Sequence, residues 1–535
     1  MRRGDRKSNW LRMFPYSVKG KGSQFETISI FSLYFSAFIL IVFEFIQQDY
    51  DWDIDHEIYY GQQLLYGNLL WTEEFHDKLP MVQYFFALVV ASGSPIINWR
   101  LISLFSAMLA IVCVIRVLPG VLVLAGHAEG RARKAALLSG GLFLLVSSVM
   151  PGGFTHINVM PASMAIVAML LGLTLLQTKE NLLRIFITSI SAGLAATISV
   201  SFRPYFFFPL AISFLITGFL ILTEKAVGLD HKCYRFSTFI LFPVVLGVGL
   251  NLGPYLLSGS LKDFFSGLDF LLKPSPPSSS ILNFFIAPGF ELGWVLRFWL
   301  AGMLFYALAA IGVNSRRGRA GIKLALIPLS AISLFFGILS QHFWSHYINL
   351  FSWYFAILLA VGVVSMSPII SPYFKGRLLK ILLPANIVPI GLSILATFVS
   401  LPSMNELTRE HPSQPLVRAL ENNLMDFEDS RPIFFAPENM YVHWKLKESR
   451  HGFPHSANTR HISRGLWEEI KGSYVFRHPK NIESYCFELL QSQVQVIILS
   501  EDSSLLPCLS SQKKQWRMEL ILLSDAEVWY LWFRR

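Results

Sequence analysis

The hydrophobic and polar positions of this chain alternate in long blocks. Apolar runs of about 20 residues recur between Phe31 and Ser400, and each is long enough to cross a bilayer as a helix. The pattern predicts an α-helical polytopic membrane protein. We expect eleven spans, at residues 27–46, 97–116, 135–151, 158–177, 183–202, 204–223, 237–257, 292–314, 323–341, 348–370 and 379–401.

The basic residues divide the connections between these spans into two kinds. Connections 151–157 and 342–348 contain no Lys or Arg, whereas alternate connections carry clusters, at 131–134, 179–184, 225–235, 316–323 and 375–380. Lys and Arg are enriched in cytoplasmic loops. We therefore expect a protein of the plasma (inner) membrane with a cytoplasmic N-terminus and an extracytoplasmic C-terminal part.

One apolar stretch, Leu79 to Ser94, is short for a span at about 16 residues. Counting it as a span would also turn the basic cluster at 131–134 outward. We expect it to form a juxtamembrane helix at 80–94 instead, within one outer loop that covers residues 47–96.

The pattern changes after Leu401, where short apolar strings alternate with polar ones. "RPIFFAP" and "VQVIILS" are typical of buried strands, and residues 406–424 and 482–491 of amphipathic helices. The predicted domains are therefore a transmembrane domain, 1–401, and a small extracytoplasmic α/β domain, 402–535. A disulfide between Cys486 and Cys508 is permitted in that domain, but the sequence leaves it open.

The composition agrees with a membrane protein and excludes several classes of binding partner. The 535 residues are 53% hydrophobic and 15% charged, against roughly 25% charged in soluble domains. The net charge of +10 is spread between apolar runs and forms no basic face for nucleic acid. No Cys/His spacing resembles a zinc site and no Gly-rich nucleotide loop is present. Membrane lipids are expected partners; nucleic acid, cofactors and divalent metals are not.

Chemistry is most strongly indicated just after the first span, where acidic residues crowd together with apolar ones. Helical spacing would place Asp53 and Glu57 on one face and Asp55 beside it. Closely placed carboxylates at an interface suit a general base. The alternative is a solvated acidic loop, in which each carboxylate caps a helix or pairs with a neighbouring Lys.

The same loop resembles that of a known superfamily. "D-x(5)-Y-Y-G-Q-x-L-L-x-G" from Asp53, followed by "FHDKLP" and "WRLIS", is similar to the first outer loop of the GT-C glycosyltransferases, in the branch of aminoarabinose and protein O-mannosyl transferases. Family members carry a "D-x-K-P-P" type string, from which this chain departs because Leu79 precedes its single Pro80. "SFRP" at 201–204 and "HFWSHY" at 342–347 occupy later positions in the expected order.

The resemblance implies transfer of a sugar from a polyprenyl-phosphate-linked donor to an acceptor hydroxyl of a glycan, lipid or protein on the outer face of the membrane. Asp53 is the first choice for the base because its offset to Gly67 matches the family; Asp55 is second and Glu57 third. The competing interpretation is a lipid or sugar transporter or flippase without transferase chemistry. The other expected site residues are Lys78, Arg203 and Arg100 for the donor phosphate, and His76, Asp77, His346 and Tyr347 for substrate.

Overall fold

The structure of the chain is a computed structural model. It describes residues 31–32, 35, 38–39, 52–65, 67, 69–71, 78–124, 127–149, 156–176, 181–224, 228–272, 327, 329–334, 349–370, 413–424, 434–435, 490, 496–501, 506–510, 516–522 and 528–534. The chain divides into two compact units. Unit 1 contains residues 1–45, 100–250 and 279–401, and unit 2 contains residues 46–99, 251–278 and 402–535.

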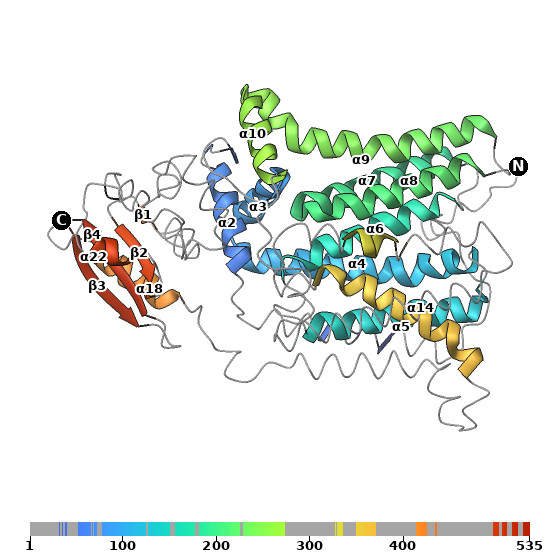
Figure 1. Cartoon of the computed structure of the whole chain (residues 1–535), viewed down its shortest axis with the longest axis horizontal. Coiled ribbons are helices and arrows are strands. Elements are labelled where there is room, and N and C mark those ends of the chain that lie inside the picture. Colours follow the sequence, from blue (N-terminus) through green and yellow to red (C-terminus); the bar gives the residue numbers. More distant parts are fainter. Residues whose placement is uncertain are drawn as a thin grey trace, which may run out of the picture. The chain divides into compact units, whose positions relative to one another are not determined.

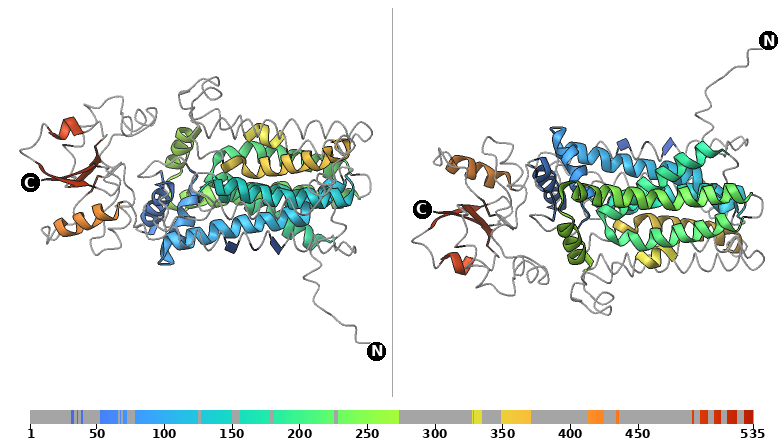
Figure 2. Two further views of the ribbon diagram at one scale, coloured as in Figure 1. Left: turned by 90° about the horizontal axis from the view of Figure 1, so that it is seen from below. Right: turned by 90° about the horizontal axis from the view of Figure 1, so that it is seen from above.

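Unit 1 is a bundle of long apolar helices that run side by side (Figures 1 and 2). Its helix α6 is buried on every side and packs against α7, α8 and α14, while α14 also packs along α5. A helix that is hydrophobic all round belongs in the interior of a bundle. The helices are α4 (Pro95–Leu124), α5 (Glu129–Val149), α6 (Val159–Thr174), α7 (Leu182–Phe202), α8 (Phe207–Leu222), α9 (Leu229–Ser258) and α14 (Ser352–Ile370). The start of α4, residues 95–99, and the end of α9, residues 251–258, belong to unit 2.

Each of these helices overlaps a predicted span, but α5 and α9 begin earlier than expected, at Glu129 and Leu229, and α4 extends further, to Leu124. Within the described residues, four helices are long and apolar enough to cross a membrane: Pro95–Val123, Leu182–Phe202, Pro204–Leu222 and Leu229–Ser258. The spans expected at 292–314 and 379–401 lie outside the described residues, and those at 27–46 and 323–341 are described only in part. The total of eleven spans therefore stays a prediction.

Glycines set the close approach of helices inside the bundle. A Cβ atom at Gly193 of α7 would lie 2.9 Å from the backbone nitrogen of Pro243 in α9, and one at Gly172 would lie 2.7 Å from the Phe239 ring. That ring is stacked on Phe214 of α8, with centroids 4.3 Å apart. Small residues at helix contacts are typical of membrane proteins, because they let backbones meet.

Unit 2 contains a pair of short helices, α2 (Trp52–Leu65) and α3 (Met81–Ala91), packed against each other. The backbones touch at Gly61, where a Cβ would lie 2.5 Å from the carbonyl carbon of Phe86. The buried side chain of Gln83 accepts a hydrogen bond from the backbone N–H of Leu70 and donates one to the carbonyl of Tyr60. Helix α3 lies within the predicted juxtamembrane helix at 80–94.

The connection that follows α2 is held by aromatic contacts. Trp71 is buried with a φ of 64°, in the left-handed region that bulky residues rarely adopt. Its ring lies against Phe264 of α10 (Leu261–Leu272), with centroids 5.6 Å apart. Tyr255 donates a hydrogen bond from its hydroxyl to the carbonyl of Leu70, next to Trp71. The backbone of this connection is therefore fixed from the end of α9 and from α10.

A four-stranded sheet forms the C-terminal part of unit 2, in the order β1-β2-β4-β3 (Figure 1). β1 (Phe434–Phe435) is parallel to β2 (Val496–Ser500), and β4 (Val528–Arg534) is antiparallel to both β2 and β3 (Trp516–Leu522). β1 and β2 lie in the two strings expected to be strands.

Two short helices are also described in this part of the chain, α18 (Gln414–Leu424), which contacts β3, and α22 (Leu506–Ser510). α18 lies in the segment 406–424 that was expected to be an amphipathic helix. The helix expected at 482–491 lies almost wholly outside the described residues, as do Cys486 and the side chain of Cys508.

Candidate functional site

The acidic residues after the first span form the start of helix α2. Asp53 and Asp55 lie in its first turn, where the positive end of the helix dipole favours negative charge. Ile54, Ile58 and Tyr59 are buried and hold the helix against its surroundings. The acidic cluster is therefore part of a packed helix, as the helical spacing predicted.

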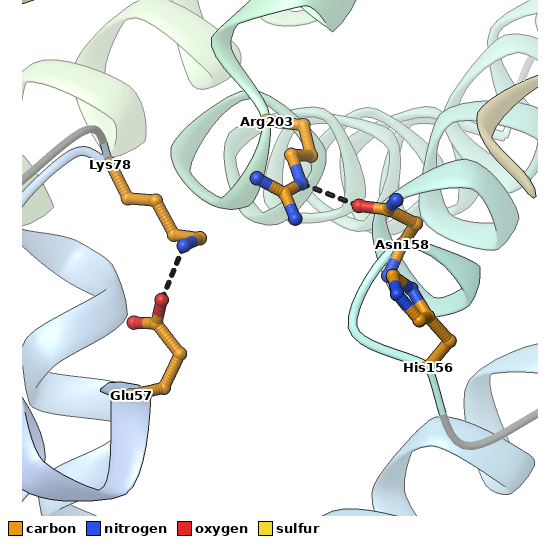
Figure 3. A network of polar contacts seen from close by, with 5 residues as sticks. All are labelled: Glu57, Lys78, His156, Asn158 and Arg203. Atoms are coloured by element: carbon orange, nitrogen blue, oxygen red, sulfur yellow. Dashed lines mark hydrogen bonds and ion pairs between the residues drawn. The ribbon is translucent and has the colours of Figure 1, made fainter. Parts of the chain in front are cut away.

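Glu57 and Lys78 form a buried ion pair within unit 2. Lys78 Nζ lies 2.5 Å from Glu57 Oε1, and the side chains are 3% and 0% exposed (Figure 3). Removing two charges from water is costly, and a charge-assisted hydrogen bond at this distance offsets part of the cost. The pair therefore holds a cation and a carboxylate in a fixed, water-excluded position.

The other two carboxylates of α2 differ in burial and direction. Asp53 is partly exposed and lies four residues before Glu57, so it shares the helix face that meets Lys78. Asp55 is only 3% exposed and lies two residues from Glu57, on a different side of the helix. Of the two, Asp53 has the more accessible carboxylate.

Lys78 is positioned by the way α3 begins. Pro80 occupies the N-cap position of α3, two residues after Lys78. The backbone N–H of Met81 donates a hydrogen bond to Oδ1 of Asn251 in α9, at 2.9 Å. The start of α3, and with it Lys78, is therefore tied to a residue far along the chain.

A second polar group, in unit 1, contains Arg203. This residue ends helix α7 in an extended conformation (φ −142°, ψ 97°), as expected for a residue that precedes a proline, here Pro204. Its side chain is 3% exposed, and its Nε–H donates to Oδ1 of Asn158 at 2.5 Å (Figure 3). A cation at a helix C-terminus is also favoured by the helix dipole.

His156 supports Asn158 from the other side. Its ring nitrogen Nδ1 accepts the backbone N–H of Asn158 at 3.1 Å, and both residues are buried. An Nδ1 that accepts must be unprotonated, so the ring carries its proton on Nε2 in the neutral form. The three residues form a chain of contacts from His156 through Asn158 to Arg203.

The remaining predicted site residues divide into described and undescribed ones. Arg100 lies in the second turn of α4 and is buried, with 7% of its surface exposed. No cluster of three His, Cys, Asp or Glu side chains suited to a metal occurs in the described part of the chain. His76, Asp77, His346 and Tyr347 lie outside the described residues.

Sequence reasoning did not select Asn158. An asparagine at the start of an apolar span is ordinarily a helix cap, and nothing in its immediate sequence indicates another role. The packing of consecutive antiparallel spans could have indicated the role of Asn158. The start of α6 and the end of α7 lie at the same end of such a pair, so a buried Arg203 calls for a polar residue near position 158.

Comparison with known proteins gives a fold. No family model and no curated protein matches the sequence. ArnT from Cupriavidus metallidurans bound to undecaprenyl phosphate is similar in structure, with a TM-score of 0.58 and 12% identity over 94% of this chain and 98% of that one. Its apo state gives a TM-score of 0.56, also at 12% identity, with 94% and 98% of the two chains covered.

The archaeal oligosaccharyltransferase AglB from Archaeoglobus fulgidus is also similar. It was solved in complex with an inhibitory peptide and a dolichol-phosphate, and it gives a TM-score of 0.50 and 13% identity over 95% of this chain and 74% of that one. These likenesses confirm the GT-C fold that the loop motifs predicted. The chain is an integral membrane protein with the fold of the GT-C membrane glycosyltransferases.

Proposed function

We propose that this chain transfers a sugar from a polyprenyl-phosphate-linked donor to an acceptor hydroxyl at the outer face of the membrane. The observation that carries the proposal is the buried Glu57–Lys78 pair beside the acidic first turn of α2, in a chain with the GT-C fold. ArnT and AglB were solved with undecaprenyl phosphate and a dolichol-phosphate, which supports a lipid phosphate as a partner here. The proposed acceptor is a glycan, lipid or protein.

The proposed chemistry uses one carboxylate and fixed positive charge. Asp53 takes the proton of the acceptor hydroxyl, whose oxygen attacks the anomeric carbon of the sugar. The bond from that carbon to the phosphate oxygen breaks, and the electron pair leaves with the phosphate. Cations placed where this charge develops stabilise the transition state. Lys78, Arg203 and Arg100 are the proposed cations.

The other expected residues take supporting roles in this proposal. Glu57 is the least suited of the three carboxylates to act as base, because its oxygen already accepts from the Lys78 ammonium. Its proposed role is to hold Lys78. Asp55 stays the alternative base. Substrate contacts are proposed for His76, Asp77, His346 and Tyr347.

A transporter or flippase is supported less well by the positions of buried charge. Such a protein needs charged groups in the middle of its spans. The buried arginines of the described long helices lie near helix ends instead: Arg100 and Arg235 within two turns of a start, and Arg203 at a C-cap. Charge at the ends of spans suits a site at the membrane surface.

The function is tested by comparing cell-surface glycans, by mass spectrometry, in cells with the wild-type chain, without it, and with Asp53→Asn. We expect one sugar to disappear without the chain and with the variant, while the variant is present in the membrane at wild-type level. Glycans that do not change in either case would contradict the transferase. If the chain is a transporter, it moves labelled lipid across the membrane of vesicles. In that case a separate enzyme transfers the sugar, and Asp53→Asn leaves that transfer unchanged.

The orientation is part of the proposal. The Lys/Arg distribution supports a cytoplasmic N-terminus and an extracytoplasmic domain 402–535, in the inner membrane. Reporter fusions after Arg319 and after Arg409 are expected to report opposite sides of the membrane. The same side for both fusions would contradict the eleven-span topology.

A further inference from the structure

Two asparagines at equivalent positions of neighbouring helices use their side chains differently. Asn181, at the N-cap of α7, accepts a hydrogen bond from the backbone N–H of Arg184 at 3.1 Å, which is the ordinary capping contact. Asn158, at the N-cap of α6, makes no side-chain cap bond to its own helix. Its Oδ1 accepts from Arg203 Nε at 2.5 Å instead. The side chain of Asn158 therefore serves a residue of another helix.

The contact between Asn158 and Arg203 fixes a direction without neutralising a charge. A guanidinium is a planar fork, so a hydrogen bond from Nε sets the plane in which its terminal amino groups lie. The acceptor is an amide oxygen, which is neutral, so this bond leaves the positive charge of Arg203 in place. Both side chains are buried, which limits the side-chain conformations that they can adopt.

We propose that Asn158 is a positioning residue that aims the Arg203 guanidinium at the phosphate of the lipid donor, with His156 holding Asn158 in place. The inference rests on the proposed function, because it takes Arg203 as a ligand of that phosphate. His156 contributes by accepting the Asn158 backbone N–H, an arrangement that mimics an Asx turn and fixes the residue from which the amide extends.

The test measures binding of undecaprenyl phosphate, without a sugar, to the full-length protein in lipid nanodiscs. Asn158→Leu keeps the shape of the side chain and removes the acceptor, and we expect it to weaken binding about tenfold. The same change in an Arg203→Ala background should weaken binding no further, because Asn158 acts through Arg203. Wild-type affinity in Asn158→Leu, or independent losses in the double variant, would overturn the proposal.

A second variant separates positioning from simple structural support. Asn158→Asp keeps an acceptor for Nε but adds a negative charge, which neutralises the guanidinium. We expect it to weaken binding of undecaprenyl phosphate while the melting temperature stays at or above the wild-type value. A hydrogen bond with only a structural role predicts wild-type affinity for this variant, and that result would count against the proposal even if Asn158→Leu failed to fold.

The controls identify the part of the lipid that is recognised. Asn181→Leu removes the matched cap and should lower the melting temperature without changing lipid affinity. Binding of the uncharged polyprenol should be the same in wild type and Asn158→Leu. An equal loss for polyprenol would overturn the proposal, because it would show a deformed lipid groove and not a lost phosphate contact.

The role of His156 has its own pair of variants. His156→Asn places an amide oxygen where Nδ1 lies and should retain most of the lipid affinity, because Asn accepts a backbone N–H two residues on. His156→Phe fills the same space without an acceptor and should weaken binding as Asn158→Leu does. If the two variants bind undecaprenyl phosphate with equal affinity, His156 does not hold Asn158 in place.

These binding results are separable from the proposed function. If sugar transfer cannot be detected with the wild-type protein but the coupled loss of phosphate binding is found, the transferase proposal fails and the positioning role stands. If the wild-type protein transfers a sugar but Asn158→Leu and Asn158→Asp bind undecaprenyl phosphate normally, the positioning role fails alone.

Discussion

The ammonium of Lys78 and the carboxylate of Glu57 meet at 2.5 Å with neither side chain appreciably exposed to water. Breaking such a pair from one side leaves a buried charge uncompensated, which costs about 3–5 kcal/mol. We therefore expect Glu57→Gln to lower the thermal stability of the purified protein sharply. Unfolding is followed by intrinsic fluorescence in detergent.

Two further variants serve as controls for the effect of Glu57→Gln on stability. Glu57→Gln combined with Lys78→Met should recover most of the stability, because no buried charge remains. Glu129→Gln breaks the partly exposed pair with Arg133 in α5 and should cost about 0.5 kcal/mol or less. If Glu57→Gln is as mild as Glu129→Gln, the Lys78 ammonium is not confined as the structure describes.

Asp53 and Asp55 lie in the same turn of α2 but on different sides of the helix, so a substrate hydroxyl can face one of them. General base catalysis contributes roughly 10²- to 10⁴-fold. We expect Asp53→Asn to abolish turnover while donor binding survives, and Asp55→Asn and Glu57→Gln to retain partial activity. Turnover is measured as release of polyprenyl phosphate. The reverse order would assign the base to Asp55.

Gly61 lets the backbones of α2 and α3 touch, since a Cβ there would lie 2.5 Å from Phe86. Backbone cannot move aside as a flexible side chain can, so Gly61→Ala should separate the helices and cost about 1–3 kcal/mol. Turnover should fall with stability, because α2 carries the three carboxylates. Gly249→Ala in α9 is the matched control: nothing lies within 4 Å of its added methyl group, and alanine favours a helix.

His127, between α4 and α5, has a pKa lowered from its usual 6.5 by burial and, secondarily, by the charge of Arg131. The folded protein therefore binds this proton less readily than the unfolded chain. Stability is present above about pH 6.5 and falls as the pH drops through that value toward the folded pKa. His127→Gln should flatten the decrease in melting temperature between about pH 7 and pH 5. An unchanged slope would show that other groups dominate it.

Much of the fold was accessible from the sequence because a membrane imposes a simple pattern. The span expected at 183–202 differs from α7 by one residue, and the span expected at 204–223 differs by one residue from the apolar helix Pro204–Leu222, of which α8 is the α-helical part. The polar turn at Arg203–Pro204 separates these two apolar runs. Helix α4 extends beyond the predicted 97–116 to Leu124, because its apolar sequence continues through Pro119 without a strong stop. In the sheet, β3 and β4 were not predicted.

The site was accessible only in part. The spacing of Asp53 and Glu57 predicted their shared face, because helix geometry relates residues four apart. Pairing with a neighbouring Lys was the alternative given for each carboxylate, and Glu57 follows it. The sequence did not give Lys78 as the partner, since the chain between them passes through a left-handed residue at Trp71 whose direction no local pattern gives. Asn158 was missed for a similar reason, because its partner Arg203 lies on another helix.

Trp71 and Gly267 constrain each other although they are far apart in the chain. The Trp71 ring occupies the space where a side chain at 267 would begin, since a Cβ there would lie 2.1 Å from ring carbon Cδ2. The two positions are therefore not free to vary separately: any side chain at 267 requires a smaller residue at 71. A lineage that replaced Trp71 with glycine would relieve the left-handed backbone and make position 267 permissive in one step. A side chain at position 267 is therefore tolerated more easily after Trp71 has been replaced than before.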